Sequence, residues 1–499
     1  MSTLLRTKSV EQSLRDTDHP DHRLKKNLGT LDLVVFGVGV TIGGGLFVLT
    51  GSAANLYAGP ALALSFVVAA VACGLAALCY AEFASTVPVA GSAYTFSYAT
   101  IGELVAWIIG WDLILEFIVG AAAVAGGWSG YLQNVLAGTP LEIPAAVSNT
   151  SDGFMNLPAG LLVLVLTGIL IAGIKLSSRV NQIAVAVKVA VALLFVLVGV
   201  FLVKTANLTP FVPDSQPSQG SSGLQAPLVQ ILFGLEPMTY GWGGIVTGAA
   251  IVFFAFIGFD VVATTAEETR DPKRNVPIGI FGSLAICTLL YCAVTLVLTG
   301  MQNYAKIDPE DPAPLSTAFT NAGHDNIANV IAVGAAVGIV VVVMILLLGQ
   351  SRVAFAMARD GLLPPVFAKV HPTFRTPYVI TTVVGVLVAI LASFTSIDVL
   401  AELVNVGTLF AFILVSLGVI LLRRRRPDLE RAFRVPLVPW IPIASALVCF
   451  YLMLNLAVET WLRFVVWMAI GLVIYFLYGR RHSRVGKEPV DTAAVSTEP

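Results

Sequence analysis

The sequence predicts an all-helical membrane protein with twelve transmembrane helices, and three observations support this fold class. Hydrophobic residues make up 57% of the 499 residues, and the mean hydropathy is +0.86. Charged residues make up only 12%, about half of the roughly 25% that soluble domains carry. Apolar stretches long enough to cross a bilayer, which takes about 20 residues, recur from Leu31 to Tyr478. We therefore expect the outer surface of the protein to face lipid.

Each predicted span is an apolar run bounded by polar or charged residues. Three runs are longer than a bilayer requires, which predicts tilt or cytoplasmic extension. The first thirty residues are polar and charged, so no cleavable signal peptide is expected. The twelve predicted spans are Leu31–Leu56, Pro60–Val87, Gly102–Leu136, Leu157–Ile174, Val180–Val203, Gly241–Ala266, Val276–Thr299, Asn326–Ala356, Tyr378–Phe394, Val399–Leu422, Leu437–Leu456 and Thr460–Tyr478.

The basic residues gather on one side of the predicted helices. When the connections are assigned alternately to two sides, all but four of the 29 Lys and Arg residues lie on the side of the N-terminal tail. Lys188 lies inside a span, and Lys204, Lys306 and Arg463 lie on the opposite side. Because cytoplasmic loops carry the excess of basic residues, both termini are predicted to be cytoplasmic, in a multi-pass protein of the plasma membrane.

The sequence argues against an enzyme and against a bound cofactor or metal. It contains no HExxH, GxSxG or P-loop motif, and all five histidines lie in tails or loops. The five cysteines lie in apolar stretches without metal-ligand spacing, which is typical of small buried residues. No pore loop or charged ring indicates a channel. No soluble signalling domain is expected at either end, which argues against a receptor.

Two spans carry signs of an interrupted helix. The first contains three consecutive glycines, Gly43 to Gly45, at mid-membrane, and each glycine costs a helix about 1 kcal/mol relative to alanine. The sixth contains Gly258 among phenylalanines, followed by Asp260. Unwound backbone at that depth is tolerated where it lines a cavity or is covered by protein. Interruptions at matching positions of two halves point to a transporter site between inverted repeats.

Free N–H and C=O groups at the broken helix ends suit the carboxylate and ammonium groups of an α-amino acid.

The predicted spans divide the chain into six parts. The parts are a cytoplasmic tail (1–30), a first five-helix repeat (31–203), an extracellular loop (204–240), a second five-helix repeat (241–422), spans 11 and 12 (423–479) and a cytoplasmic tail (480–499).

Lys188 lies about 12 Å deep in the fifth span, at 1.5 Å per residue. A lysine at this depth should face the protein interior and meet carbonyls or a carboxylate, and it is a functional candidate. Asp112 and Glu116, which share one helix face, and Asp260 are its candidate partners. Glu82, near the cytoplasmic end of the second span, is interpreted as a gate or interfacial residue.

The eighth span argues against sodium coupling. Between Asn329 and Gln350 it contains no Ser, Thr, Asp or Glu, whereas hard cations need oxygen ligands. Proton coupling or uncoupled exchange is therefore favoured. Met344 and the neighbouring valines also offer no acceptor for a cationic substrate side chain.

Four segments together resemble one family of transporters. They are Val40–Phe47 (VTIGGGLF), Gly110–Glu116 (GWDLILE), Phe253–Asp260 (FFAFIGFD) and Glu267–Pro277 (EETRDPKRNVP). They resemble the amino acid–polyamine–organocation superfamily, and within it the cationic amino acid transporter branch in its twelve-span bacterial form. The resemblance extends from about residue 25 to about residue 478.

The resemblance implies a leucine-transporter-like fold of two inverted five-helix repeats plus two C-terminal helices, with alternating access to a central site. It implies that the substrate carboxylate meets the backbone of Thr41, Ile42, Gly43, Gly44 and Gly45. The α-amino group would meet carbonyls in the stretch Phe254, Ala255, Ile257 and Gly258, with Phe254 as an aromatic gate. Lys188 would replace a sodium ion and act with Glu116 and Asp260 in proton coupling.

The expected function is secondary active transport of amino acids across the bacterial cell membrane, by proton-coupled symport. An amino-acid exchanger, a polyamine transporter and a transport-like amino-acid sensor are the alternatives. Cationic and small neutral substrates are equally compatible with the sequence. The expected partners are the substrate, protons and the lipid bilayer, without nucleic acid, and a small single-span accessory subunit is left open.

Overall fold

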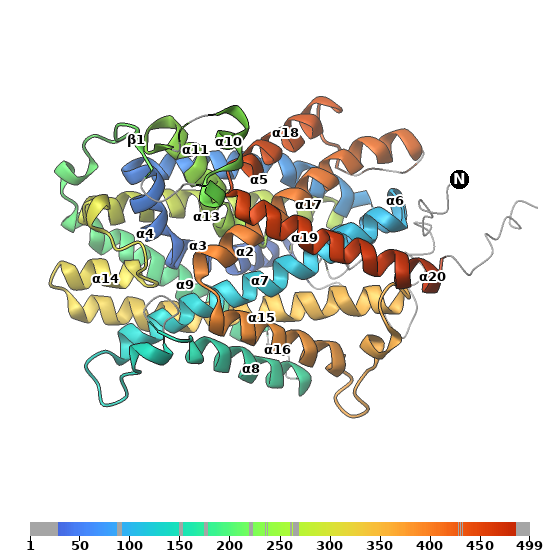
Figure 1. Ribbon diagram of the computed structural model, residues 1–499, viewed down its shortest axis with the longest axis horizontal. Helices are drawn as coiled ribbons and strands as arrows, with labels where there is room; N and C mark the ends of the chain where they lie inside the picture. The colour runs from blue at the N-terminus through green and yellow to red at the C-terminus, as the bar shows by residue number, and fades with distance from the viewer. Residues whose placement is uncertain are drawn as a thin grey trace, which may run out of the picture.

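The protein is a bundle of helices that run side by side along the longest axis of the molecule (Figure 1). This computed structural model describes residues 28–86, 92–148, 153–173, 178–218, 223–234, 236, 238–259, 262, 269–427, 429, 431 and 433–485. Seven helical runs are long and apolar enough to cross a membrane, and five shorter apolar helices accompany them. The chain is therefore an all-helical membrane protein.

Each predicted span overlaps one of the main helices. The seven long runs are built on α5 (Leu62–Thr86), α7 (Glu103–Leu136), α9 (Ser178–Gly199), α13 (Pro272–Met301), α15 (Asp325–Arg359), α17 (Ile397–Arg425) and α19 (Val458–Ile474). The five shorter apolar helices are α2 (Thr30–Thr41), α8 (Leu157–Ile171), α11 (Gly241–Val252), which continues as a 3-10 turn to Phe256, α16 (Tyr378–Phe394) and α18 (Trp440–Leu454).

The remaining described elements are short. The helices among them are α3 (Gly44–Phe47), α4 (Leu49–Ala53), α6 (Ser92–Thr100), α10 (Leu228–Phe233), α14 (Pro314–Asn321) and α20 (Arg480–His482). Strands β1 (Gln216–Pro217) and β2 (Met238–Thr239) pair in antiparallel fashion.

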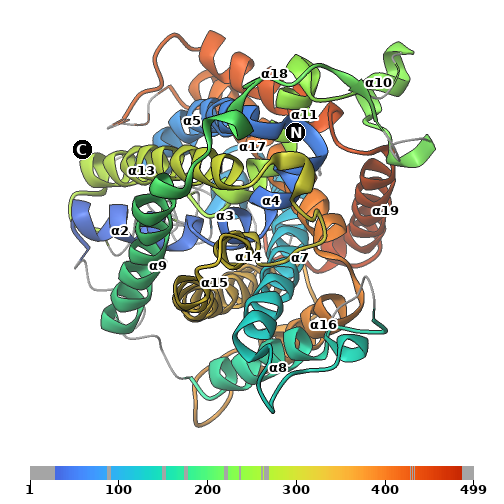
Figure 2. The same ribbon diagram turned by 90° about the vertical axis from the view of Figure 1, so that its left-hand side faces the viewer.

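Helix α7 forms the core of the bundle. Its most apolar window is 94% buried, and it packs against α15 and α17. Seen from one end, α3 and α7 lie near the middle, with α9 and α13 on one side, α19 on the other, and α8 beside α16 (Figure 2). A helix that is hydrophobic on all faces belongs in such a position. The inner faces of α7 and α15 therefore can line a central site.

The first predicted span is not one continuous helix. It consists of α2, α3, α4 and a π-helical turn (Ala54–Ala58). The connection to α5 has no loop, because Gly59 turns the chain with φ of +60° and begins the 3-10 turn Gly59–Ala61, in which Pro60 is the second residue. A positive φ suits glycine, and proline suits the first positions of a helix.

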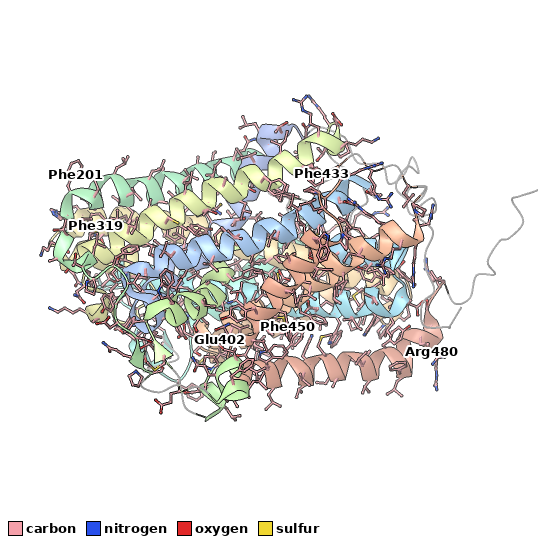
Figure 3. All side chains as sticks on the ribbon, turned by 90° about the horizontal axis from the view of Figure 1, so that it is seen from above. Phe201, Phe319, Glu402, Phe433, Phe450 and Arg480 are labelled. Atoms are coloured by element: carbon pink, nitrogen blue, oxygen red, sulfur yellow. The ribbon has the colours of Figure 1, made fainter. Side chains whose placement is uncertain are left out.

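The two ends of the bundle differ in the residues they carry. Figure 3 places Phe433 and Arg480 near one end and Phe201 and Phe319 near the other. The first end also holds the last turn of α17, with Arg423, Arg424 and Arg425. This is the end that the distribution of basic residues predicts to be cytoplasmic.

Candidate functional site

The glycine triplet interrupts the first span, as the sequence predicted. Helix α2 ends at Thr41 and α3 begins at Gly44. Ile42 between them is extended, with φ of −73° and ψ of 102°. We call Ile42–Gly43 the first break. The helix ends that meet there leave backbone groups without the usual helical partners.

Lys188 binds the carbonyl oxygens next to the first break. Its side chain is fully buried, and Nζ donates hydrogen bonds to the carbonyls of Gly39 and of Ile42, the latter at 3.0 Å. Gly338 of α15 makes room for the lysine, because a Cβ there would overlap the methylene groups of Lys188. A cation is also favourable at the C-terminal end of a helix such as α2. The ammonium group thus holds the first break in place.

The sixth span is interrupted where the sequence placed its second irregular stretch. Helix α11 ends at Val252 and is followed by a 3-10 turn, then by extended Ile257 and by Gly258 with φ of +109°. We call Phe253–Gly258 the second break. Gly258 packs on Val40, and a Cβ there would come within 2.5 Å of Val40 Cγ1. Asp260, the third predicted coupling residue, lies outside the described residues.

The two breaks contact each other. A Cβ at Gly45 would overlap the backbone of Ala255, so this glycine is required by packing. The hydroxyl of Tyr291 from α13 lies 2.9 Å from the Thr41 carbonyl and 2.8 Å from the Ala255 carbonyl. Since a hydroxyl carries one proton, it shares that proton between the two breaks. Sequence reasoning missed Tyr291.

Asn405 makes a second connection, between α17 and the end of α11 just before the second break. Both amide hydrogens of Asn405 in α17 are used, because Nδ2 donates to the carbonyls of Ala250 and Ile251 at 2.9 Å each. Asn405 is fully buried. Sequence reasoning missed this residue too, because a single asparagine in a span does not reveal which neighbour it meets.

A cavity lies between the breaks, with about 320 Å³ of space between atoms including its open side. We call it the central cavity. Thr41 lines it, and the Oγ1 atom of Thr41 is buried without a hydrogen-bond partner among the described residues. This hydroxyl is therefore free to bond a molecule in the cavity. The lining residues are Val40, Thr41, Gly43, Gly44, Gly45, Gly120, Val124, Phe254, Ile257, Val342 and Leu346.

The structure divides the nine predicted substrate-binding residues into two groups. Six line the central cavity: Thr41, Gly43, Gly44, Gly45, Phe254 and Ile257. The other three are not among the residues that line the cavity. Ile42 offers its carbonyl to Lys188, Ala255 packs on Gly45, and Gly258 packs on Val40.

The side-chain end of the cavity comes from residues that sequence reasoning did not single out. Gly120 and Val124 stand four apart on α7, and Val342 and Leu346 stand four apart on α15. Residues at this spacing share a helix face. Because the stretches of both helices around these four residues are apolar on every side, the sequence did not show which face turns inward. Met344 is not among the lining residues.

The hydrogen bonds of Lys188 go to backbone carbonyls and not to the carboxylates of α7 among the described residues. Asp112 and Glu116 are buried, but Asp112 lies next to α17, where a Cβ at Gly407 would be 2.9 Å from its Oδ1. Neither oxygen of Asp112 has a hydrogen-bond partner among the described residues. Asp112 therefore lies beside α17, and coupling of Lys188 to the carboxylates of α7 stays a prediction.

Glu82 lies in a cluster of charged residues where three segments of the chain meet. Its fully buried carboxylate pairs with Arg423 at 2.6 Å and accepts a hydrogen bond from the backbone N–H of Val435 at 2.7 Å. Arg431 Nε lies 3.5 Å from the same carboxylate. This cluster ties α5 to the end of α17 and to the connection before α18.

Comparison with known proteins identifies the family. A family model described as amino acid permease matches residues 28–478, which include both breaks and the central cavity. The chain belongs to the amino acid permease family. It is accordingly a transport protein and not an enzyme.

Relatives cover nearly the whole permease chain. The methylthioribose transporter of Bacillus subtilis is 45% identical over 491 residues, covering 98% of this chain and 100% of the relative. The branched-chain amino acid permease BcaP of the same organism is 46% identical, covering 97% and 99%. The human cationic amino acid transporter 4 is 31% identical, covering 96% and 90%. The family thus includes proteins named for different substrates.

Proposed function

We propose that this permease is a secondary active transporter of amino acids with apolar side chains, coupled to protons and working by alternating access. One observation carries the proposal: the central cavity lies between two broken helices, and apolar side chains line it. Transporters built from inverted repeats bind their substrates at such paired interruptions. The repeats would be 31–203 and 241–422, within twelve spans, in a bacterial cell membrane with both termini cytoplasmic.

The backbone at the breaks suits the part common to all α-amino acids. The amides of Gly43, Gly44 and Gly45 open the outer half of the first span, where an anion is favourable. Thr41 Oγ1 adds an unused donor for the substrate carboxylate. The ammonium group would bind carbonyls of the second break. Although the Ala255 carbonyl already accepts from Tyr291, a carbonyl oxygen has a second lone pair.

The lining favours a neutral substrate side chain over a cationic one. The side chains that line the cavity include Val124, Val342, Leu346, Phe254 and Ile257, all of them apolar. No acidic side chain is among the lining residues that the structure describes, and an unpaired buried charge is costly. The same argument disfavours a polyamine. The name of the relative BcaP, a branched-chain amino acid permease, agrees with an apolar side chain.

Proton coupling is proposed to run through Lys188 with Glu116 and Asp260. The Lys188 ammonium occupies two carbonyls at the first break. Loss of its proton would remove the positive charge from this helix end and weaken the hold on the break. A sodium ion at those oxygens would lie beside the positive charge of the ammonium group, and this repulsion argues against sodium binding there.

A second candidate substrate is methylthioribose, after the transporter of that name. This uncharged thioether sugar has no carboxylate or ammonium group, and its methylthio group would suit the apolar end of the cavity. An amino acid would use the backbone N–H and C=O groups at the breaks to bind its carboxylate and ammonium groups, whereas methylthioribose has neither group.

Thermal unfolding of the purified protein with added ligands tests the proposal. A ligand at about 100 times its Kd stabilises the folded state by about 2.7 kcal/mol. We expect leucine, isoleucine and valine to raise the unfolding temperature, and arginine and leucinol, which lacks the carboxylate, to leave it unchanged. Stabilisation by arginine would overturn the apolar class, and stabilisation by methylthioribose alone would favour the second candidate. Uptake into proteoliposomes distinguishes a transporter from a sensor.

A further inference from the structure

The four glycines that line the central cavity differ in the space around them. A Cβ on Gly45 would overlap the backbone of Ala255. A Cβ on Gly43 would lie 3.3 Å from Val342, and one on Gly44 would lie 3.3 Å from Val124, tighter than ordinary carbon contacts. Packing at the first break therefore explains these three glycines.

Close packing does not explain why residue 120 is a glycine. A Cβ on it would lie 3.7 Å from Leu346 Cδ1 and 3.8 Å from Val404 Cγ2, which are ordinary contact distances. Gly120 lies in the middle of α7, and its φ is not positive. Glycine destabilises a helix interior relative to alanine. Neither packing nor backbone conformation requires glycine here, so the space beside it is available to a ligand.

We infer that Gly120 sets the size of the substrate side chain that the permease accepts. This inference rests on the proposed function. The space next to Gly120 is bounded by Leu346, which also lines the cavity. The end of a leucine-sized side chain occupies this space, whereas alanine is too short to reach it. A methyl group at position 120 takes the place of the last carbon atoms of the larger substrate.

The test is the Gly120→Ala variant, reconstituted in proteoliposomes, with uptake of leucine and of alanine measured separately. One methylene group in a hydrophobic pocket changes discrimination by about 10- to 200-fold. We expect the KM for leucine to rise about tenfold, while the KM for alanine stays within about twofold. Because the added Cβ meets ordinary contact distances, the variant should fold, and its unfolding temperature checks this.

Two further variants sharpen the result. Gly74→Ala is the matched control, because Gly74 is a helical glycine of α5 whose Cβ would lie 3.8 Å from Leu284, outside the cavity lining. It should leave the ratio of the two KM values unchanged. In the Gly120→Ala background, Leu346→Val restores space on the same side, and leucine uptake should recover.

The outcomes separate this inference from the proposed function. An unchanged ratio of KM values in Gly120→Ala, or an equal loss of both substrates, would overturn the role of Gly120 while the wild-type protein still transports amino acids. Wild-type protein that takes up neither substrate would overturn the proposed function itself, and the role of Gly120 with it.

Discussion

At the scale of single residues, the buried charge of Lys188 holds the backbone of the first break in place. We expect Lys188→Met to abolish uptake driven by a pH gradient, since methionine fills similar space but cannot donate to the carbonyls of Gly39 and Ile42. Each buried acceptor left without a partner costs about 1–3 kcal/mol, so the unfolding temperature should also fall. Proteoliposome uptake with and without an imposed pH gradient measures the effect.

The matched control is Lys204→Met, because Lys204 is exposed and follows the end of α9. It removes the same charge without touching a break, and uptake should remain. Full pH-dependent uptake by Lys188→Met would remove Lys188 from proton coupling.

At this scale the sequence predicted where a charge lies but not which neighbours it meets. The depth of Lys188 predicted a partner of carbonyl or carboxylate type, and its carbonyl contacts confirm that expectation. The shared face of Asp112 and Glu116 followed from their spacing, yet Asp112 lies beside Gly407. Spacing fixes two residues relative to each other, whereas the neighbouring helix depends on packing of the whole bundle. Tyr291 escaped prediction for the same reason.

At the scale of elements, the second break depends on one backbone conformation. Gly258 has φ of +109° and packs on Val40. An L-residue in such a region costs about 1–3 kcal/mol, and the added Cβ would also displace Val40. We expect Gly258→Ala to lower the free energy of unfolding by about that amount and to reduce uptake strongly. Chemical denaturation and proteoliposome uptake measure the two effects.

Gly243→Ala provides the comparison within the same half-helix. Gly243 lies in α11, and a Cβ there would meet no atom within 4 Å. Alanine is the better helix former, so this variant should be as stable as the wild type or slightly more stable. If Gly258→Ala behaved in the same way, the second break would not need its special backbone.

The elements themselves were largely predictable because lipid exposure imposes a strong apolar signal. The ends of α16 match the prediction at both residues. Consecutive glycines revealed the first break because they lower helix propensity locally. The turn at Gly59 was less visible, since its φ of +60° allows α4 and α5 to follow each other without a loop. Local sequence therefore predicts interruptions better than the direction that the chain takes after them.

At the scale of the whole molecule, charge divides the two ends of the bundle. The basic last turn of α17 lies toward the end where Figure 3 places Arg480. This distribution supports the proposed cytoplasmic position of both termini. The same end contains the Glu82 cluster, which joins α5 from the first proposed repeat to α17 from the second. A change at Glu82 should therefore affect how the two halves hold together.

We expect Glu82→Gln to lower the free energy of unfolding by about 1.5–3 kcal/mol, because it weakens the charged hydrogen bonds that a buried carboxylate makes with Arg423, whose side chain is 27% exposed. Glu82 is fully buried, whereas the side chains of Glu459 and Arg463 in a second pair are 36% and 35% exposed. Surface pairs contribute about 0–1 kcal/mol, so Glu459→Gln is the control with a small expected loss. Denaturation of both variants in the same detergent makes the comparison. Equal losses would show that the Glu82 cluster does not stabilise the contact between the two halves, whereas the expected difference would locate a major part of that stability at the end of the bundle that carries the basic residues.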